Sequence, residues 1–186
     1  MTIPDEYRIA DLAALTALYG EPRASARIKE TPALQPAQRA FIKAAPFLVL
    51  ATAGPDGLDI SPRGDAPGFV EVQDDKTLLL PDRRGNNRVD SLRNIIADPR
   101  VALLFLIPGI TQALRVNGEA RISVEPALLE RFSAAGQAPR SVLVIGVQTV
   151  FFQHSRAIRH ARLWDADAQR LHDAPRGDGA ATDWIE

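Results

Sequence analysis

Two predicted loops of the chain carry arginine and amide side chains that can bind an anion. The first reads Ser61-Pro62-Arg63-Gly64-Asp65 after a predicted strand, and the second reads Asp82-Arg83-Arg84-Gly85-Asn86-Asn87-Arg88 directly before a predicted helix. Guanidinium groups and the free amides at a helix start both favour a negatively charged ligand. Two arginines balance the charge of about −1.5 to −2 on a phosphate monoester. The two loops therefore predict a phosphate site, although the same composition also suits a pair of solvated turns.

Other common kinds of reactive site are missing from the sequence. The chain has no cysteine, which excludes disulfides, thiolate metal sites, iron–sulfur clusters and a cysteine nucleophile. Its three histidines, His154, His160 and His172, form no pair at metal-binding spacing, and we expect no bound metal. Neither a nucleophile elbow, a Walker phosphate loop nor a dinucleotide-binding glycine motif occurs. A phosphate-bearing ligand at the arginine loops is the hypothesis that remains.

Composition and charge are those of an ordinary globular protein. The chain has 186 residues, of which 46% are hydrophobic and 24% charged, and its formal net charge is −1. A chain with so little net charge has no positive field to hold nucleic acid. The acidic start at Asp5 and Glu6 is unlike a signal peptide, and the longest apolar runs, 101–107 and 142–147, are too short to span a bilayer. We expect a cytoplasmic protein that binds neither nucleic acid nor a membrane.

The spacing of apolar residues and turn formers predicts a mainly β protein with helical decoration. Apolar residues three apart between Tyr7 and Tyr19 predict a first helix, and Pro36 opens a second that ends near Ala45. Six or so strands follow, within residues 47–52, 58–60, 68–72, 77–80, 101–107, 113–124 and 141–152, with short helices at 89–97, 127–135 and 155–161. Hairpins in this order close into an antiparallel barrel. The predicted parts are a helical extension at 1–45, a barrel domain at 46–165 and a polar tail at 166–186.

Five motifs along the chain, taken in order, resemble those of one protein family. They are Phe47–Thr52, Asp59–Asp65, Leu80–Arg88, Asn94–Phe105 and Leu114–Arg121. With them the chain resembles the pyridoxamine 5′-phosphate oxidase-like, FMN-binding split-barrel proteins, from Phe47 to about Trp164. The resemblance implies a six-stranded antiparallel split β-barrel with an N-terminal helical extension, and FMN as the cofactor.

The resemblance also implies which residues hold the FMN. The loop before the helix would bind the phosphate, where Arg88 keeps the family's charge and Asn86 and Asn87 stand at the neighbouring positions. Asparagine suits a tight turn there and can donate amide hydrogens to phosphate oxygens. Arg63 stands where the family has an arginine at the end of its second strand. The full set of expected cofactor-binding residues is Arg63, Asn86, Asn87, Arg88, Ser61, Pro81, Asp82, Arg84, Gln112 and Trp164.

Proteins of this family are usually homodimers with flavin in a cleft at the subunit interface, so the resemblance implies a homodimer that holds FMN between its chains. The segment His154–Trp164 would then approach the partner's flavin, with Trp164 over the ring. The implied function is an FMN-dependent oxidoreductase acting on a small planar substrate, with no catalytic side chain assigned. One alternative is a flavin-binding carrier or sensor without turnover. Another is a barrel that holds a deazaflavin, or haem with His154 as the axial ligand.

The C-terminal tail repeats part of a substrate-binding motif of true pyridoxamine 5′-phosphate oxidases. Trp164 and Arg170-Leu171-His172-Asp173 have the spacing of that motif, in which the arginine and the histidine engage the substrate. The chain has Ala174 where the true enzymes have a second arginine. We therefore favour a chance match in a polar tail, and we rank a true pyridoxamine 5′-phosphate oxidase below the other interpretations.

Overall fold

The computed structural model of the chain describes residues 4, 7–21, 29–134 and 136–167, which fall into two units. The first unit, within Met1–Glu30, contains helix α1 (Leu12–Tyr19), where Asp11 caps the helix by accepting a hydrogen bond from the Ala14 N–H at 2.8 Å. The second unit lies within Thr31–Glu186. Its elements are α3 (Pro36–Ala44), β1 (Phe47–Gly54), β2 (Gly57–Gly64), β3 (Glu71–Val72), β4 (Thr77–Asp82), α4 (Asp90–Ala97), β5 (Arg100–Leu106), β6 (Gln112–Ser123), α5 (Pro126–Arg131), β7 (Ser141–His154) and α6 (Arg156–His160).

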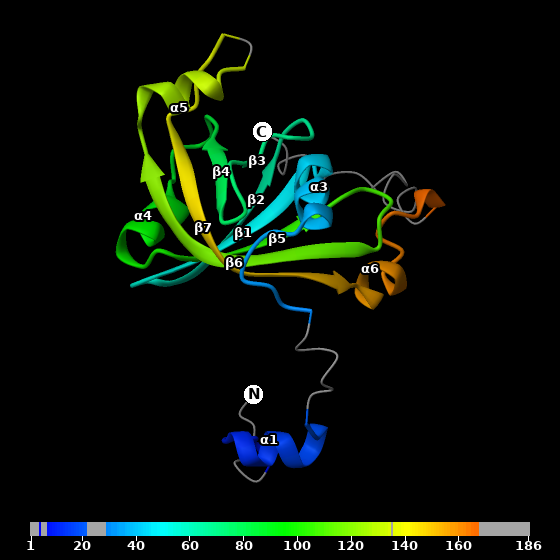
Figure 1. Ribbon diagram of the computed structural model, residues 1–186. Helices are drawn as coiled ribbons and strands as arrows, with labels where there is room; N and C mark the ends of the chain where they lie inside the picture. Colours follow the sequence, from blue (N-terminus) through cyan, green and yellow to red (C-terminus); the bar gives the residue numbers. More distant parts are fainter. Residues whose placement is uncertain (1–3, 5–6, 22–28, 135, 168–186) are drawn as a thin grey trace, which may run out of the picture. The chain divides into compact units, whose positions relative to one another are not determined.

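Seven antiparallel strands form one bent sheet in the order β2-β1-β5-β6-β7-β4-β3 (Figure 1). Alternate residues of the central strands point into the core, so that Leu48 and Leu50 of β1 and Leu103 and Phe105 of β5 are at most 2% exposed. This alternation is the pattern of strands with one buried face. The predicted fold class, a mainly β antiparallel split barrel with helices, is confirmed, with seven strands in place of six.

Strands β6 and β7 form the longest pairing of the sheet, and it contains an irregularity. The register shifts between Asn117 and Gly118, which is the signature of a β-bulge. A Cβ atom added to Gly118 would lie 2.1 Å from the carbonyl oxygen of Gly146 on β7. The two backbones therefore approach so closely that only glycine fits, and the bulge increases the bend of the two strands.

The element boundaries differ from the prediction in ways that affect the site. Strand β2 continues to Gly64, whereas the predicted strand ended at Ile60, so Ser61 and Arg63 belong to a strand and not to a loop. The strand pairs along its whole length with β1, where Arg63 lies opposite Leu48. The first of the two predicted anion-binding segments is therefore part of the sheet.

Helices α3 and α4 pack on the sheet. Helix α3 starts at Pro36, contacts β3 and β6, and buries Ile42 completely. Helix α4 contacts β1, β2 and β6, and Ile95 is its main buried side chain. Figure 1 shows these two helices well apart on the barrel, with α4 beside β6. Helix α4 is the element that carries the second arginine loop into the site.

Three further sequence predictions concern membrane-spanning helices, the divisions between the parts of the chain, and the C-terminal tail. None of the helices in the described parts of the chain has the length and hydropathy that crossing a membrane requires. The predicted divisions after residues 45 and 165 stay predictions. Residues 168–186, which include Arg170 and His172, lie outside the part of the chain that the structure describes.

Candidate functional site

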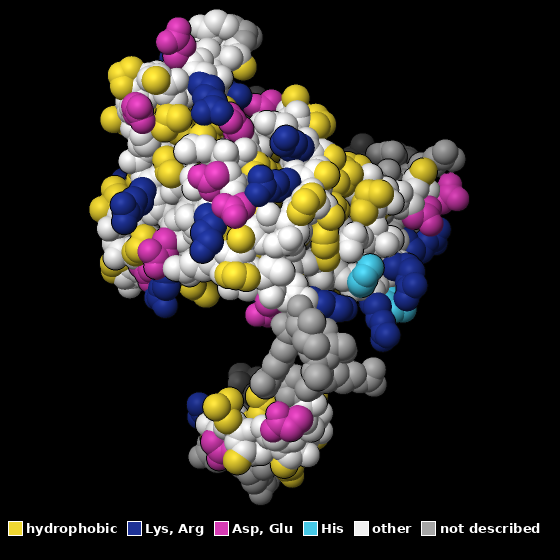
Figure 2. Space-filling view, in the orientation of Figure 1, with side chains coloured by type: hydrophobic (Ala, Val, Ile, Leu, Met, Phe, Trp, Pro, Cys, Tyr) yellow, Lys and Arg dark blue, Asp and Glu magenta, His cyan; other side chains and the backbone are white. Residues whose placement is uncertain are grey.

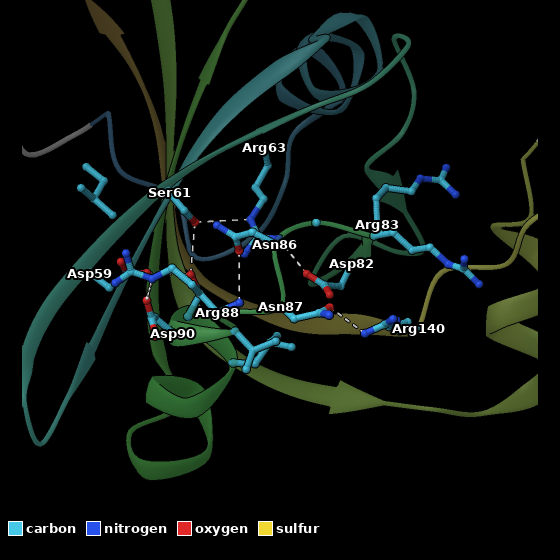
Figure 3. A pocket seen from close by; sticks show the side chains of 16 residues that line it. Asp59, Ser61, Arg63, Asp82, Arg83, Asn86, Asn87, Arg88, Asp90 and Arg140 are labelled. Atoms are coloured by element: carbon cyan, nitrogen blue, oxygen red, sulfur yellow. Dashed lines mark hydrogen bonds and ion pairs between the residues drawn. The ribbon is translucent and has the colours of Figure 1, made fainter. Parts of the chain in front are cut away.

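A cavity of about 380 Å³ lies between β2, the end of β4, the loop 83–89 and the first turn of α4 (Figure 3). Seven of the ten predicted cofactor-binding residues line it: Ser61, Arg63, Asp82, Arg84, Asn86, Asn87 and Arg88. The cavity thus brings together the two arginine segments, of which one lies on the edge strand β2 and the other follows β4, the neighbour of the opposite edge strand β3.

Arg63 enters the cavity from β2 and forms an ion pair with the last residue of β4. Its Nη1 lies 2.7 Å from Oδ1 of Asp82, and the two side chains are 23% and 14% exposed. Four strands separate β2 from β4 in the sheet order. The ion pair therefore joins two parts of the barrel that share no backbone hydrogen bonds, and it occupies one edge of the Arg63 guanidinium.

A chain of hydrogen bonds ties β2 to the start of α4. The Ser91 hydroxyl donates to Oδ2 of Asp59 at 2.7 Å, and the Oγ atoms of Ser61 and Ser91 lie 3.1 Å apart. Because the Ser91 proton is used, Ser61 is the donor of that second bond, and its Oγ accepts from Nε of Arg63 at 3.3 Å. Ser91 is 3% exposed. The network orients Arg63 and holds the helix start against the strand.

The loop before α4 contains two residues in the left-handed region of backbone space. Asn87 has φ 62° and Val89 has φ 52°. Asparagine adopts this conformation readily, but a β-branched valine does so at a cost in conformational energy. Asn86 stabilises the turn because its Oδ1 accepts the Arg88 N–H at 3.1 Å. The strained backbone at Val89 lies directly at the cavity, as strained backbone at binding sites often does.

The start of α4 is open to an anion. Val89 stands at the N-cap position and makes no side-chain capping bond. The amides of the first helical turn, at Asp90, Ser91 and Leu92, belong to residues that line the cavity, and such amides find no partner within their own helix. Asp90 Oδ2 instead accepts a 2.9 Å bond from Nε of Arg88, which is 77% exposed.

Positive charge dominates the cavity. Five arginines and three aspartates line it, which leaves a formal net charge of +2. Arg84 is exposed, and its side chain has no hydrogen bond or ion pair among the described residues. The guanidinium of Arg83 is already engaged, because its Nε pairs with Asp65 at 3.0 Å and its Nη1 donates to the Phe132 carbonyl at 2.6 Å.

Nine of the sixteen lining residues were not among the predicted set. Four of these nine make side-chain hydrogen bonds to other lining residues: Asp59, Asp90, Ser91 and Arg140. Asp59 could have been found from the alternation on β2, which puts it on the same face as Ser61 and Arg63. Arg140 gave no such signal. It stands just before β7, and its Nη1 donates to Oδ1 of Asn87 at 2.7 Å across 53 residues of sequence. Only the pairing of β4 with β7 brings it there.

Three predicted residues lie elsewhere in the chain. Pro81 is buried in β4 opposite Val142. Gln112 begins β6 and pairs with His154, and the Trp164 indole Nε1 donates to the Ile110 carbonyl at 2.9 Å. Their predicted contacts with a cofactor stay predictions. Within the described ranges, no group of three histidine or acidic side chains could hold a metal ion.

Comparisons with solved structures agree with this fold. HupZ from Group A Streptococcus superposes with a TM-score of 0.54 at 20% identity, over 66% of this chain and 95% of that chain. A protein from Lactobacillus delbrueckii, named as a candidate pyridoxamine 5′-phosphate oxidase, superposes with a TM-score of 0.50 at 24% identity, over 65% of this chain and 95% of that chain. These likenesses concern the fold, and no curated protein sequence matches the chain. The family model described as pyridoxamine 5′-phosphate oxidase matches residues 34–154, and the chain therefore belongs to the pyridoxamine 5′-phosphate oxidase family.

Proposed function

We propose that the chain binds FMN with the phosphate in the cavity beside α4, and that it acts as an FMN-dependent oxidoreductase on a small planar substrate. One observation carries the proposal: an uncapped helix start and five arginines face the same cavity. Arginine forks and first-turn amides are two of the groups that most often bind phosphate in proteins. Membership of the family supports FMN as the molecule that bears this phosphate.

The residues of the cavity fit a phosphate group by charge and by donor set. The net charge of +2 balances a phosphate monoester of about −2. Arg84 has its whole guanidinium free within the described structure, and the ion pair of Arg88 uses only its Nε. The volume of about 380 Å³ lies in the usual range of small-molecule sites.

Apolar side chains at the same cavity suit the flavin ring. Ile60 is 71% exposed and Val89 is 41% exposed, although both line a cavity rich in charge. Exposed apolar groups beside a charged pocket favour a ligand with one polar end and one flat apolar end. FMN has both.

The flavin supplies the redox chemistry once it is bound. The chain then has four tasks: to hold the phosphate, to orient the ring, to exclude water and to supply positive charge. Arg84 and Arg88 would hold the phosphate by charge-assisted hydrogen bonds, and the network through Ser61 and Ser91 would keep Arg63 in place. We assign no side chain to proton transfer.

The outward face of the sheet supports the proposed homodimer. Leu58 is 90% and Ile60 71% exposed on the edge strand β2. The row that starts at Ile60 continues through Ala51 and Ala102 to Asn117, whose Oδ1 is buried without a hydrogen-bond partner in the described structure. A second copy on this face would cover the apolar side chains and could donate to that oxygen. In such a dimer, Gln112 and Trp164 of one chain could reach the flavin that the partner binds. We propose that this dimer is cytoplasmic.

The absorption spectrum of the purified protein tests the proposed function. Flavin bands, or uptake of FMN by a colourless preparation, are the expected result. A protein that takes up no FMN would overturn the proposal, and a Soret band would favour haem. Consumption of reduced nicotinamide with candidate acceptors then separates an oxidoreductase from a carrier or sensor, because a carrier gives no steady-state turnover.

A further inference from the structure

A second cavity, lined by basic and hydroxyl side chains, lies at the junction of β7 and α6. Its volume is about 320 Å³, and the residues that line it are Thr111, His154, Ser155, Arg156 and Arg159. Figure 2 shows arginine and histidine side chains gathered at the lower right of the barrel, where Figure 1 places α6. The lining contains no aspartate or glutamate.

The backbone around this cavity is held in place by several bonds. Ser155 caps α6, with its Oγ accepting the Ile158 N–H at 3.2 Å, and its own N–H donates to the Thr111 carbonyl at 3.2 Å. Ile158 is 8% exposed and anchors the helix on the barrel. Arg156 and Arg159 are three residues apart, so their side chains leave the helix on one face. The two guanidinium groups therefore lie on the same face of α6, which Ser155 and Ile158 hold against the barrel.

No carboxylate within the described parts of the chain pairs with the arginines of this cavity. Neither Arg156 nor Arg159 makes a side-chain hydrogen bond or an ion pair among the residues that the structure describes. Arg162, the next arginine along the chain, does pair with Asp165. In the first cavity, by contrast, Arg63, Arg83 and Arg88 all pair with carboxylates. Two adjacent free arginines over a cavity favour an anion with more than one charge.

We infer that this cavity is a second anion site, which binds the phosphate group of a small phosphorylated molecule. Two guanidinium groups match the charge and the oxygen geometry of a phosphate dianion. The Thr111 and Ser155 hydroxyls and the His154 ring are further donors at the same place. The inference goes beyond the proposed FMN site and does not rest on it.

The two cavities are separate within one chain. Arg140, at the first cavity, directly precedes β7, and His154, at the second, is the last residue of that 14-residue strand. A strand of this length spans on the order of 40 Å when straight. A single phosphate group therefore cannot contact both cavities of one chain.

Calorimetric titration of the full chain tests the inference. Inorganic phosphate and glycerol 3-phosphate serve as probes, each added at constant ionic strength to protein with and without saturating FMN. We expect saturable binding under both conditions, because the proposed FMN phosphate lies in the first cavity. A higher affinity for the ester would identify a phosphorylated molecule as the ligand, and equal affinities would identify free phosphate.

The double variant Arg156→Gln/Arg159→Gln provides the decisive comparison. Loss of charged hydrogen bonds should lower the phosphate affinity about tenfold or more. Arg121→Gln is the matched control, since Arg121 is exposed on β6 and lines neither cavity. The inference is wrong if phosphate binding disappears on FMN saturation, survives in the double variant, or never saturates. Circular dichroism of the double variant shows whether it folds. If it does not fold, phosphate affinity is measured on each single variant.

Discussion

Arg63 and Asp82 form an ion pair, with 2.7 Å between Nη1 and Oδ1, that links two strands with four other strands between them in the sheet order. Both side chains are largely buried. The pair therefore joins β2 to β4 where no backbone pairing does, and it places a carboxylate beside an arginine at the proposed phosphate site. Asp82 should therefore stabilise the fold and at the same time weaken the binding of an anion to Arg63.

Asp82→Asn should separate these two effects. The variant removes one negative charge and frees Arg63, so we expect tighter FMN binding together with a loss of about 1 kcal/mol in the free energy of unfolding. Fluorescence titration of FMN and chemical denaturation measure the two effects. Weaker FMN binding would contradict the view that Asp82 competes with the phosphate for Arg63.

Arg88→Ala tests the phosphate contact itself. Loss of a charged hydrogen bond costs about 1.5–3 kcal/mol, so FMN affinity should fall about tenfold or more. Arg93→Ala is the control, because Arg93 is exposed on the same helix and lies outside the cavity. Equal FMN affinity in the two variants would remove Arg88 from the site.

Val89→Asn should stabilise the protein. Val89 has φ 52° and is 41% exposed, so asparagine relieves backbone strain and loses little apolar burial. We expect a gain of about 1 kcal/mol in the free energy of unfolding, measured by thermal denaturation without ligand. Val124→Asn, at an exposed valine without positive φ, should give no such gain.

Gly118→Ala should damage the barrel. The added Cβ would lie 2.1 Å from the Gly146 carbonyl oxygen, and backbone on both strands would have to move. We expect the free energy of unfolding to fall by about 3 kcal/mol, or the variant to fail to fold. Chemical denaturation measures this effect. Gly85→Ala meets nothing within 4 Å and should keep the stability of the parent protein. Equal stability of the two variants would argue against the close approach of β6 and β7.

Asp98 should contribute to stability only above acidic pH. The Arg100 side chain, and then its backbone N–H, lower the pKa of Asp98 from 3.8 to about 2. Because the folded-state pKa is the lower one, this stabilisation is fully present above about pH 4 and is lost as the pH falls to about 2. Acid denaturation of Asp98→Asn should depend less steeply on pH in that window. Arg100→Gln should have the same effect, since it removes the main cause of the shift.

Local sequence patterns predicted much of the fold. The apolar runs of β1 and β5, the turn residues between strands, and the ordered motifs that resemble one family identified a split barrel. The loop 82–88 was predicted to be an anion site. These features could be predicted because strand alternation and helix starts are properties of neighbouring residues.

The remaining features of the site depend on contacts between distant residues. Arg63 pairs with Asp82 across 19 residues, Ser91 bonds to Asp59 across 32, and Arg140 reaches Asn87 across 53. These contacts depend on the order of the strands in the sheet, and neighbouring residues do not encode that order. The alternating pattern shows which face of a strand is buried, whereas closure of the barrel determines which charges then meet.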